Sequence, residues 1–84
     1  MIHSNQLLEL NFKLKNANMH GGESDFVHPE REYIVALSNK DGDVHITHSQ
    51  FGSSGKAGEP GPSFESFEEF KKWHLEQPAF NKSQ

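Results

Sequence analysis

Apolar and polar residues alternate with a period of two along residues 7–15, where Leu8, Leu10, Phe12 and Leu14 are separated by polar or charged residues. Successive side chains of a strand point to opposite faces, so this alternation predicts a strand with one buried face and one solvated face. It is the clearest strand pattern in the chain.

Residues 31–49 are predicted to form a β-hairpin. Residues 33–37 are rich in strand formers, and apolar residues alternate with polar ones from Val44 onward. Between the two segments, Gly42 ends an Asn-Lys-Asp-Gly sequence and can take the positive φ of a short loop. Because residues 33, 35 and 37 share one face and Ile34 and Ala36 share the other, both faces are partly apolar, which predicts a central or doubly covered strand.

A different period appears in residues 63–77, where large apolar residues recur about every 100° around a helix. The predicted inner side holds Phe64, Phe67, Phe70, Lys71, His74 and Leu75, with Trp73 at its edge. Ser66 followed by Glu69 fits a capping box, and Pro78 is expected to end the helix. This helix is expected to cover the sheet, and an exposed Trp73 would also contact a partner.

The segments between these elements are rich in glycine, proline and polar residues. They predict flexible loops at about 16–30 and 50–62, and a frayed tail at 78–84. The expected architecture is therefore one small α+β domain spanning residues 1–84. It has an antiparallel sheet of about three strands in the order β-loop-β-β-α, with the amphipathic helix packed on one face.

Composition narrows the class of protein further. At 84 residues with 32% hydrophobic content, the chain can bury only a small core, so a homodimer is one way to complete it. Cysteine is absent, which removes disulfides and thiolate zinc sites and favours the cytoplasm. No stretch approaches the roughly 20 apolar residues of a membrane span, and the first residues do not resemble a signal peptide.

The net charge of −4 is concentrated in residues 23–43, which carry six acidic and two basic residues. Nucleic-acid binders need a basic surface, so this distribution counts against them and favours a protein partner with a basic face. The candidate binding residues are the acidic Glu23, Asp25, Glu30, Asp41 and Asp43, the aromatic Tyr33 and Trp73, and Lys56 in the second loop.

Catalytic and cofactor motifs are weak. The glycine-rich stretch around Lys56 departs from a phosphate-binding loop, because two residues rather than four separate its glycines. Six histidines suggest a metal, yet only His20 and His28, with Glu23 and Asp25 nearby, share a segment that can bring ligands together. We therefore assign no catalytic residue, metal or cofactor from the sequence.

The function predicted is a small non-catalytic binding or regulatory protein that acts through protein–protein contacts. Its general plan is similar to that of small acidic inhibitor and accessory proteins of phages and mobile elements, which is a likeness of plan only. A metal-dependent site built from loop histidines and carboxylates is the first alternative. A nucleic-acid-associated protein is the second.

Overall fold

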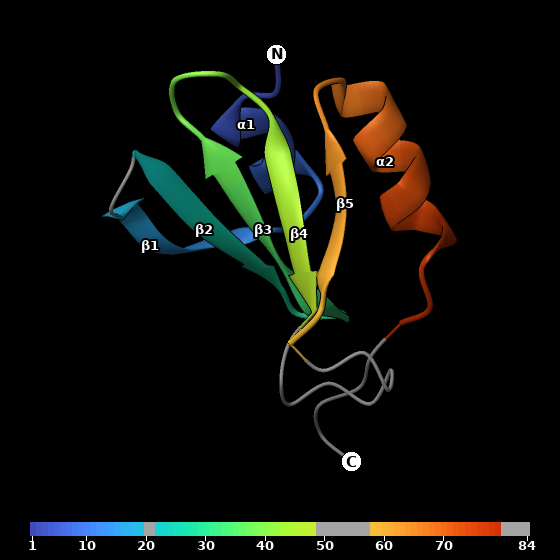
Figure 1. Cartoon of the computed structure of the whole chain (residues 1–84). Coiled ribbons are helices and arrows are strands. Elements are labelled where there is room, and N and C mark those ends of the chain that lie inside the picture. The colour runs from blue at the N-terminus through green and yellow to red at the C-terminus, as the bar shows by residue number, and fades with distance from the viewer. Residues whose placement is uncertain (20–21, 49–57, 80–84) are drawn as a thin grey trace.

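The computed structural model describes residues 1–19, 22–48 and 58–79, and in these ranges the chain forms two helices and five strands. The elements are α1 (Ser4–Glu9), β1 (Lys13–Met19), β2 (Glu23–His28), β3 (Arg31–Ser38), β4 (Val44–His48), β5 (Pro60–Phe64) and α2 (Phe67–Glu76). The strands form one antiparallel sheet in chain order (Figure 1). The α+β class is confirmed, but the expected three strands are five. Neither described helix has the length and apolar content needed to cross a membrane.

The predicted hairpin is confirmed. Val35 on β3 pairs with Ile46 on β4, and both are fully buried on the same face. Gly42 has a φ of 73°, as the tight turn requires. The strand β3 lies in the middle of the sheet, which explains why the face bearing Ile34 and Ala36 is also partly covered.

The hydrophobic core lies on one face of the sheet and draws on both ends of the chain. Its buried members are Ile2, Leu7, Phe12, Phe26, Tyr33, Val35, Leu37, Val44, Ile46 and Phe70. Figure 1 shows α1 behind the upper part of the sheet and α2 beside β5, which it contacts. The C-terminal helix was expected to cover the sheet alone, but the N-terminal segment covers part of the sheet as well.

The strand predicted at residues 7–15 is wrong for most of its length, because residues 7–12 hold the end of α1 and the turn that follows it. Residues 13–15 do belong to a strand, β1. Leu7 is buried, whereas Leu8 is 50% exposed. After the helix, Asn11 takes a left-handed φ of 74°, and its N–H donates to the Leu8 carbonyl at 3.0 Å. The N–H of Phe12 donates to the Leu7 carbonyl at 3.1 Å, which completes a Schellman motif that joins two buried apolar residues. Packing of Leu7 and Phe12 in the core outweighs the alternating pattern.

The loop predicted at 16–30 is also wrong for most of its length. It contains the end of β1 and all of β2, where Ser24, Phe26 and His28 are buried in alternation with half-buried residues. Tertiary pairing decides this, because β2 pairs with the apolar strand β3 along its length. What remains of the expected loop in the described residues is the turn containing Gly22, at a φ of 77°, and the turn at Pro29 and Glu30.

Two other segments were predicted to lack regular structure. Within 50–62, residues 50–57 lie outside the described residues, whereas residues from Pro60 onward form β5. Prolines are tolerated there because β5 is an edge strand, and one side of an edge strand needs no N–H donors. In the predicted tail, Pro78 and Ala79 have no regular structure, and residues 80–84 lie outside the described part.

The C-terminal helix is confirmed with narrower bounds. Ser66 is its N-cap, and the chain turns extended at Gln77, next to Pro78. Phe70 and His74 are buried, as expected from the helical period. Phe64 instead belongs to β5, and Leu75 is 62% exposed although it was placed on the inner side. The helix lies at the sheet edge, so only a narrow stripe of its surface meets the core.

Candidate functional site

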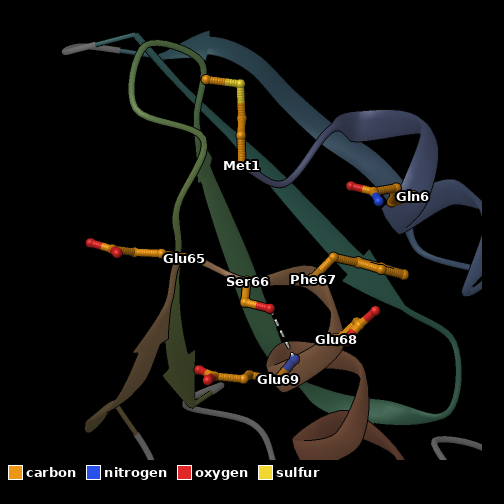
Figure 2. A pocket seen from close by; sticks show the side chains of 7 residues that line it. All are labelled: Met1, Gln6, Glu65, Ser66, Phe67, Glu68 and Glu69. Carbon is orange, nitrogen blue, oxygen red and sulfur yellow. Dashed lines mark hydrogen bonds between the residues drawn. The ribbon is translucent and has the colours of Figure 1, made fainter.

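Two adjoining hollows open where the N-terminal residue, the turn between β3 and β4 and the start of α2 meet. The first, of about 620 Å³, is lined by Met1, Gln6, Glu65, Ser66, Phe67, Glu68 and Glu69 (Figure 2). The second, of about 430 Å³, is lined by Met1, Asp41, Asp43 and Glu65. Because they share Met1 and Glu65, we treat them together as the acidic hollows. Five carboxylates surround this region.

The position of Met1 depends on the turn between the two central strands. The N–H of Ile2 donates to the Gly42 carbonyl at 2.7 Å, and Ile2 is buried in the core. A Cβ added to Gly42 would lie 2.1 Å from Cγ of Met1, so the methionine side chain occupies the space that glycine leaves. Met1 is nevertheless 71% exposed and offers an apolar contact among the carboxylates.

The start of α2 places the glutamates of the first hollow. Ser66 Oγ accepts a long hydrogen bond of 3.5 Å from the N–H of Glu69. In Figure 2, Glu65 and Glu69 point to one side, whereas Glu68 and Phe67 point toward the side of Gln6. Glu68 and Glu69 lie in the first helical turn, where the helix dipole favours negative charge. The helix dipole therefore explains the negative charge of Glu68 and Glu69, whereas Asp41 and Asp43 belong to the turn between β3 and β4 and its end.

The five carboxylates of the acidic hollows outnumber the positive charge among their lining residues, which is that of the α-amino group of Met1. In the described part of the chain, His45 lies 3.4 Å from Asp43 and His48 contacts Glu32, and these contacts become ion pairs only when the imidazole is protonated. The described residues lining the hollows include neither lysine nor arginine. Such a surface attracts cationic side chains, and Met1 and Phe67 add apolar area for the stems of those side chains.

The structure separates the acidic residues that the sequence grouped together. Asp41 and Asp43 line the second hollow. Glu23 and Asp25 lie on β2, and Glu30 lies in the turn between β2 and β3, so these three are not part of the hollows.

The predicted aromatic contacts also change. Tyr33 is only 3% exposed and belongs to the core, so its assignment as a partner contact is wrong. Trp73 is half-buried, and its ring centroid lies 4.7 Å from that of Tyr33. Lys56 lies outside the described residues.

Sequence reasoning missed most of the lining. Glu69 was predicted only as part of a capping box, and Met1, Gln6, Glu65 and Glu68 were not singled out. A weak signal existed, because Glu65 to Glu69 holds three acidic residues among five and Asp41 to Asp43 two among three, although Glu23 to Asp25 and Glu30 to Glu32 match the latter. Only the fold reveals that Glu65 lies with both aspartates around one residue.

The alternative metal site draws no support from His28. Its Nε2 lies 2.9 Å from the Leu10 carbonyl, and its Nδ1 accepts a hydrogen bond of 3.0 Å from the N–H of Glu30. Both ring nitrogens are therefore engaged by the backbone. His20 lies outside the described residues, and no group of three or more metal-binding side chains occurs within the described ones.

A line of polar side chains crosses from the β3–β4 turn to β5. His45 Nε2 lies 3.4 Å from Asp43, and His45 Nδ1 lies 2.8 Å from the hydroxyl of Ser63. These are the residue types of serine hydrolases, but His45 and Ser63 are exposed on the sheet surface. Because a serine nucleophile needs a site that excludes water and stabilises an oxyanion, we interpret this line as a link between β4 and β5.

Searches of protein-family models, curated proteins and solved structures find no match for this chain. Functional interpretation therefore rests on the geometry of the molecule.

Proposed function

We propose that this chain is a small non-catalytic binding or regulatory protein whose acidic hollows receive a basic segment of a protein partner. The observation that carries the proposal is the convergence of five carboxylates from two separate segments around Met1. Like charges gathered by tertiary structure oppose folding, so such an arrangement favours a function in which a cation offsets them.

The chemistry of the lining indicates the kind of segment that fits. Carboxylates on two sides suit lysine or arginine side chains, since guanidinium and ammonium groups pair well with carboxylates. Met1 and Phe67 provide apolar contact between the charged sides. The proposed ligand is therefore a peptide segment in which an apolar residue is flanked by basic ones, and inhibition or accessory regulation of a basic protein is the corresponding function.

The test uses two variants with equal net charge. In the first, Glu65→Gln, Glu68→Gln and Glu69→Gln remove three charges from the hollows. In the second, Glu23→Gln, Asp25→Asn and Glu30→Gln remove three charges from β2 and the following turn, outside the hollows. The second variant is the matched control, because any effect of overall charge is the same in both.

Binding is followed with a synthetic peptide that carries one leucine between pairs of arginines, by NMR chemical-shift changes at low and moderate salt. We expect shifts at Met1, Gln6 and Phe67, with affinity reduced about tenfold or more in the hollow variant and within about twofold in the control. Equal losses in the two variants would mean that binding follows net charge alone, and the proposal would fail.

The same pair of variants can then be used to capture proteins from the native host. A partner retained by the wild type and the control but lost with the hollow variant identifies the physiological ligand. A nucleic acid is the competing outcome, and it predicts a gel shift that weakens with salt. We expect no such shift, because the carboxylates of the hollows repel phosphate.

The homodimer stays a prediction. The interface of such a dimer would be the sheet face opposite the core, where Val27, Ile34 and Ala36 are only partly buried. Sedimentation equilibrium across a hundredfold range of concentration decides between monomer and dimer.

A further inference from the structure

We propose that His28 and His74 form a proton-sensitive latch that releases α2 from the sheet when both imidazoles become protonated. The two rings lie on different elements, β2 and α2, and their centroids are 5.0 Å apart in the interior. A charge on either ring therefore acts directly on the contact between the helix and the sheet.

The attachment of α2 depends strongly on His74. Only Phe70 and His74 of this ten-residue helix are fully buried. An isolated helix of this length is marginal in water, so α2 relies on its docked face. One of the two residues that secure this face is thus a side chain that can gain a charge near neutral pH.

The surroundings of His74 favour its neutral form. Its ring lies 5.0 Å from that of Phe12 and 6.0 Å from that of Phe70, and its Nδ1 lies 2.5 Å from the hydroxyl of Tyr33. The tyrosine hydroxyl can donate or accept, so the hydrogen bond alone does not oppose protonation. Burial does oppose it, together with the nearby positive charge of Arg31 and the His28 ring, and these lower the pKa of His74 to about 4.

Burial and the hydrogen bond from the N–H of Glu30 favour the neutral form of His28, whereas its bond to the Leu10 carbonyl favours the protonated form and raises its pKa. A backbone N–H can only donate and a carbonyl can only accept, so Nδ1 is the acceptor from Glu30 and Nε2–H donates to Leu10. A proton added to Nδ1 would face the N–H of Glu30 and break this contact. Burial is the main reason that the pKa of His28 is lowered, and Arg31 adds to it.

The other charged and titratable groups around the pair are few. Tyr33 faces His74 from β3, and burial raises the pKa of its hydroxyl, so this group stays neutral. Arg31, at the start of β3, acts against protonation of both histidines. Glu30 acts weakly in the opposite direction on His28. The positive charge of Arg31 and that of the other imidazole therefore outweigh the negative charge of Glu30.

The direction of the pH effect follows from these lowered pKa values. Released histidines titrate near 6.5, whereas docked ones resist protonation, so the released state binds more protons below that pH. Docking of α2 is fully stabilised above about pH 6.5 and weakens progressively as the pH falls toward about 4. Because residues 66–69 also line the first hollow, release removes one of its walls. This consequence rests on the proposed function, but the latch and its test do not.

The chain contains a built-in probe of this event. Trp73 is its single tryptophan, and in the docked helix its ring lies 4.7 Å from that of Tyr33 and 5.7 Å from that of Phe64. The experiment titrates the full chain from about pH 7.5 to 4 and records the emission maximum of Trp73. Amide hydrogen exchange of α2 and of β3 is measured at the same pH values, so that release of the helix is distinguished from unfolding of the sheet.

We expect a red shift of Trp73 and loss of α2 protection between about pH 6.5 and 4, while β3 amides stay protected, with more than one proton taken up per helix released. The double variant Tyr33→Phe with His74→Phe removes the sensor together with the hydroxyl that pairs with it, and its midpoint should fall by at least about one pH unit. His45→Gln is the matched control, because this histidine is exposed on β4, and its midpoint should equal that of the wild type.

Three results would overturn the latch: α2 protected down to pH 4, α2 and β3 lost together at one midpoint, or an unchanged midpoint in the double variant. If that variant does not fold, His28→Gln decides the question. Its amide can keep the bond to the Leu10 carbonyl without titrating, so the transition should become shallower and move to lower pH. A transition identical to that of the wild type also overturns the proposal.

Discussion

The hydroxyl of Tyr33 on β3 lies 2.5 Å from Nδ1 of His74 on α2, which joins two buried side chains that are 41 positions apart in the sequence. A buried polar group that loses its partner costs roughly 1–3 kcal/mol, whereas replacing both partners by apolar groups of similar shape can be nearly neutral. The pair therefore both secures the helix and makes it vulnerable to single substitutions.

Tyr33→Phe is expected to lower the free energy of unfolding by roughly 1–3 kcal/mol at about pH 7.5, because Nδ1 of His74 loses its partner. Adding His74→Phe should recover part of this loss. Urea denaturation of the two single variants and the double variant gives the coupling energy. Strictly additive effects would show that the hydrogen bond does not hold the helix.

The orientation of α2 predicts opposite outcomes for two apolar residues five positions apart. Phe70→Ala should cost roughly 3–5 kcal/mol, since Phe70 is completely buried in the core. Leu75→Ala should change stability by no more than about 0.5 kcal/mol, because Leu75 is largely exposed. Thermal or urea unfolding checks both, and a comparable cost for Leu75 would mean that the helix is rotated about its axis.

Substitutions at Asn11 test the helix end that the structure shows where a strand was expected. With a φ of 74°, Asn11→Ala should lose roughly 1 kcal/mol of stability, because alanine lacks the short polar side chain that lets asparagine adopt the left-handed region. Asn11→Gly should be neutral or slightly stabilising at the same position. Similar stabilities for the alanine and glycine variants would argue against the Schellman motif and for an extended segment here.

Alanine substitutions at two glycines can distinguish the effect of backbone strain from the effect of the contact that positions Met1. Gly42→Ala and Gly22→Ala both put a Cβ on a residue with positive φ, but only the Cβ at position 42 meets Met1, whereas that at position 22 meets open space. We expect both variants to lose roughly 1 kcal/mol from strain, with a further loss at position 42 alone. NMR shifts of Met1 and Gln6 should change in that variant, and equal effects of the two substitutions would contradict the contact.

Several elements were predictable because short-range rules decide them. Turn chemistry at Gly42 and the alternation after Val44 predict the hairpin, and Ser66 with Pro78 bounds the C-terminal helix. Each of these signals lies within a few residues of the structure it specifies. The acidic character of residues 41–43 and 65–69 was equally visible in the sequence.

The errors arise where distant packing competes with a local pattern. Alternation at residues 7–15 predicts a strand, yet burial of Leu7 and Phe12 against the sheet stabilises a helix ended by Asn11. The polar composition of β2 hides a strand that exists because β3 pairs with it. In both cases the deciding free energy comes from partners that the segment itself does not contain.

The candidate site depends almost wholly on packing between segments that are distant in the sequence. The amino-acid sequence determines which side chains are present, including the carboxylates, the histidines and a single tryptophan. Only the fold gathers Asp43, Glu65 and Met1 at one hollow, and only the fold places His28 beside His74. Such groups act on one another over a few ångströms, and those distances are set by the packed core rather than by separation along the chain.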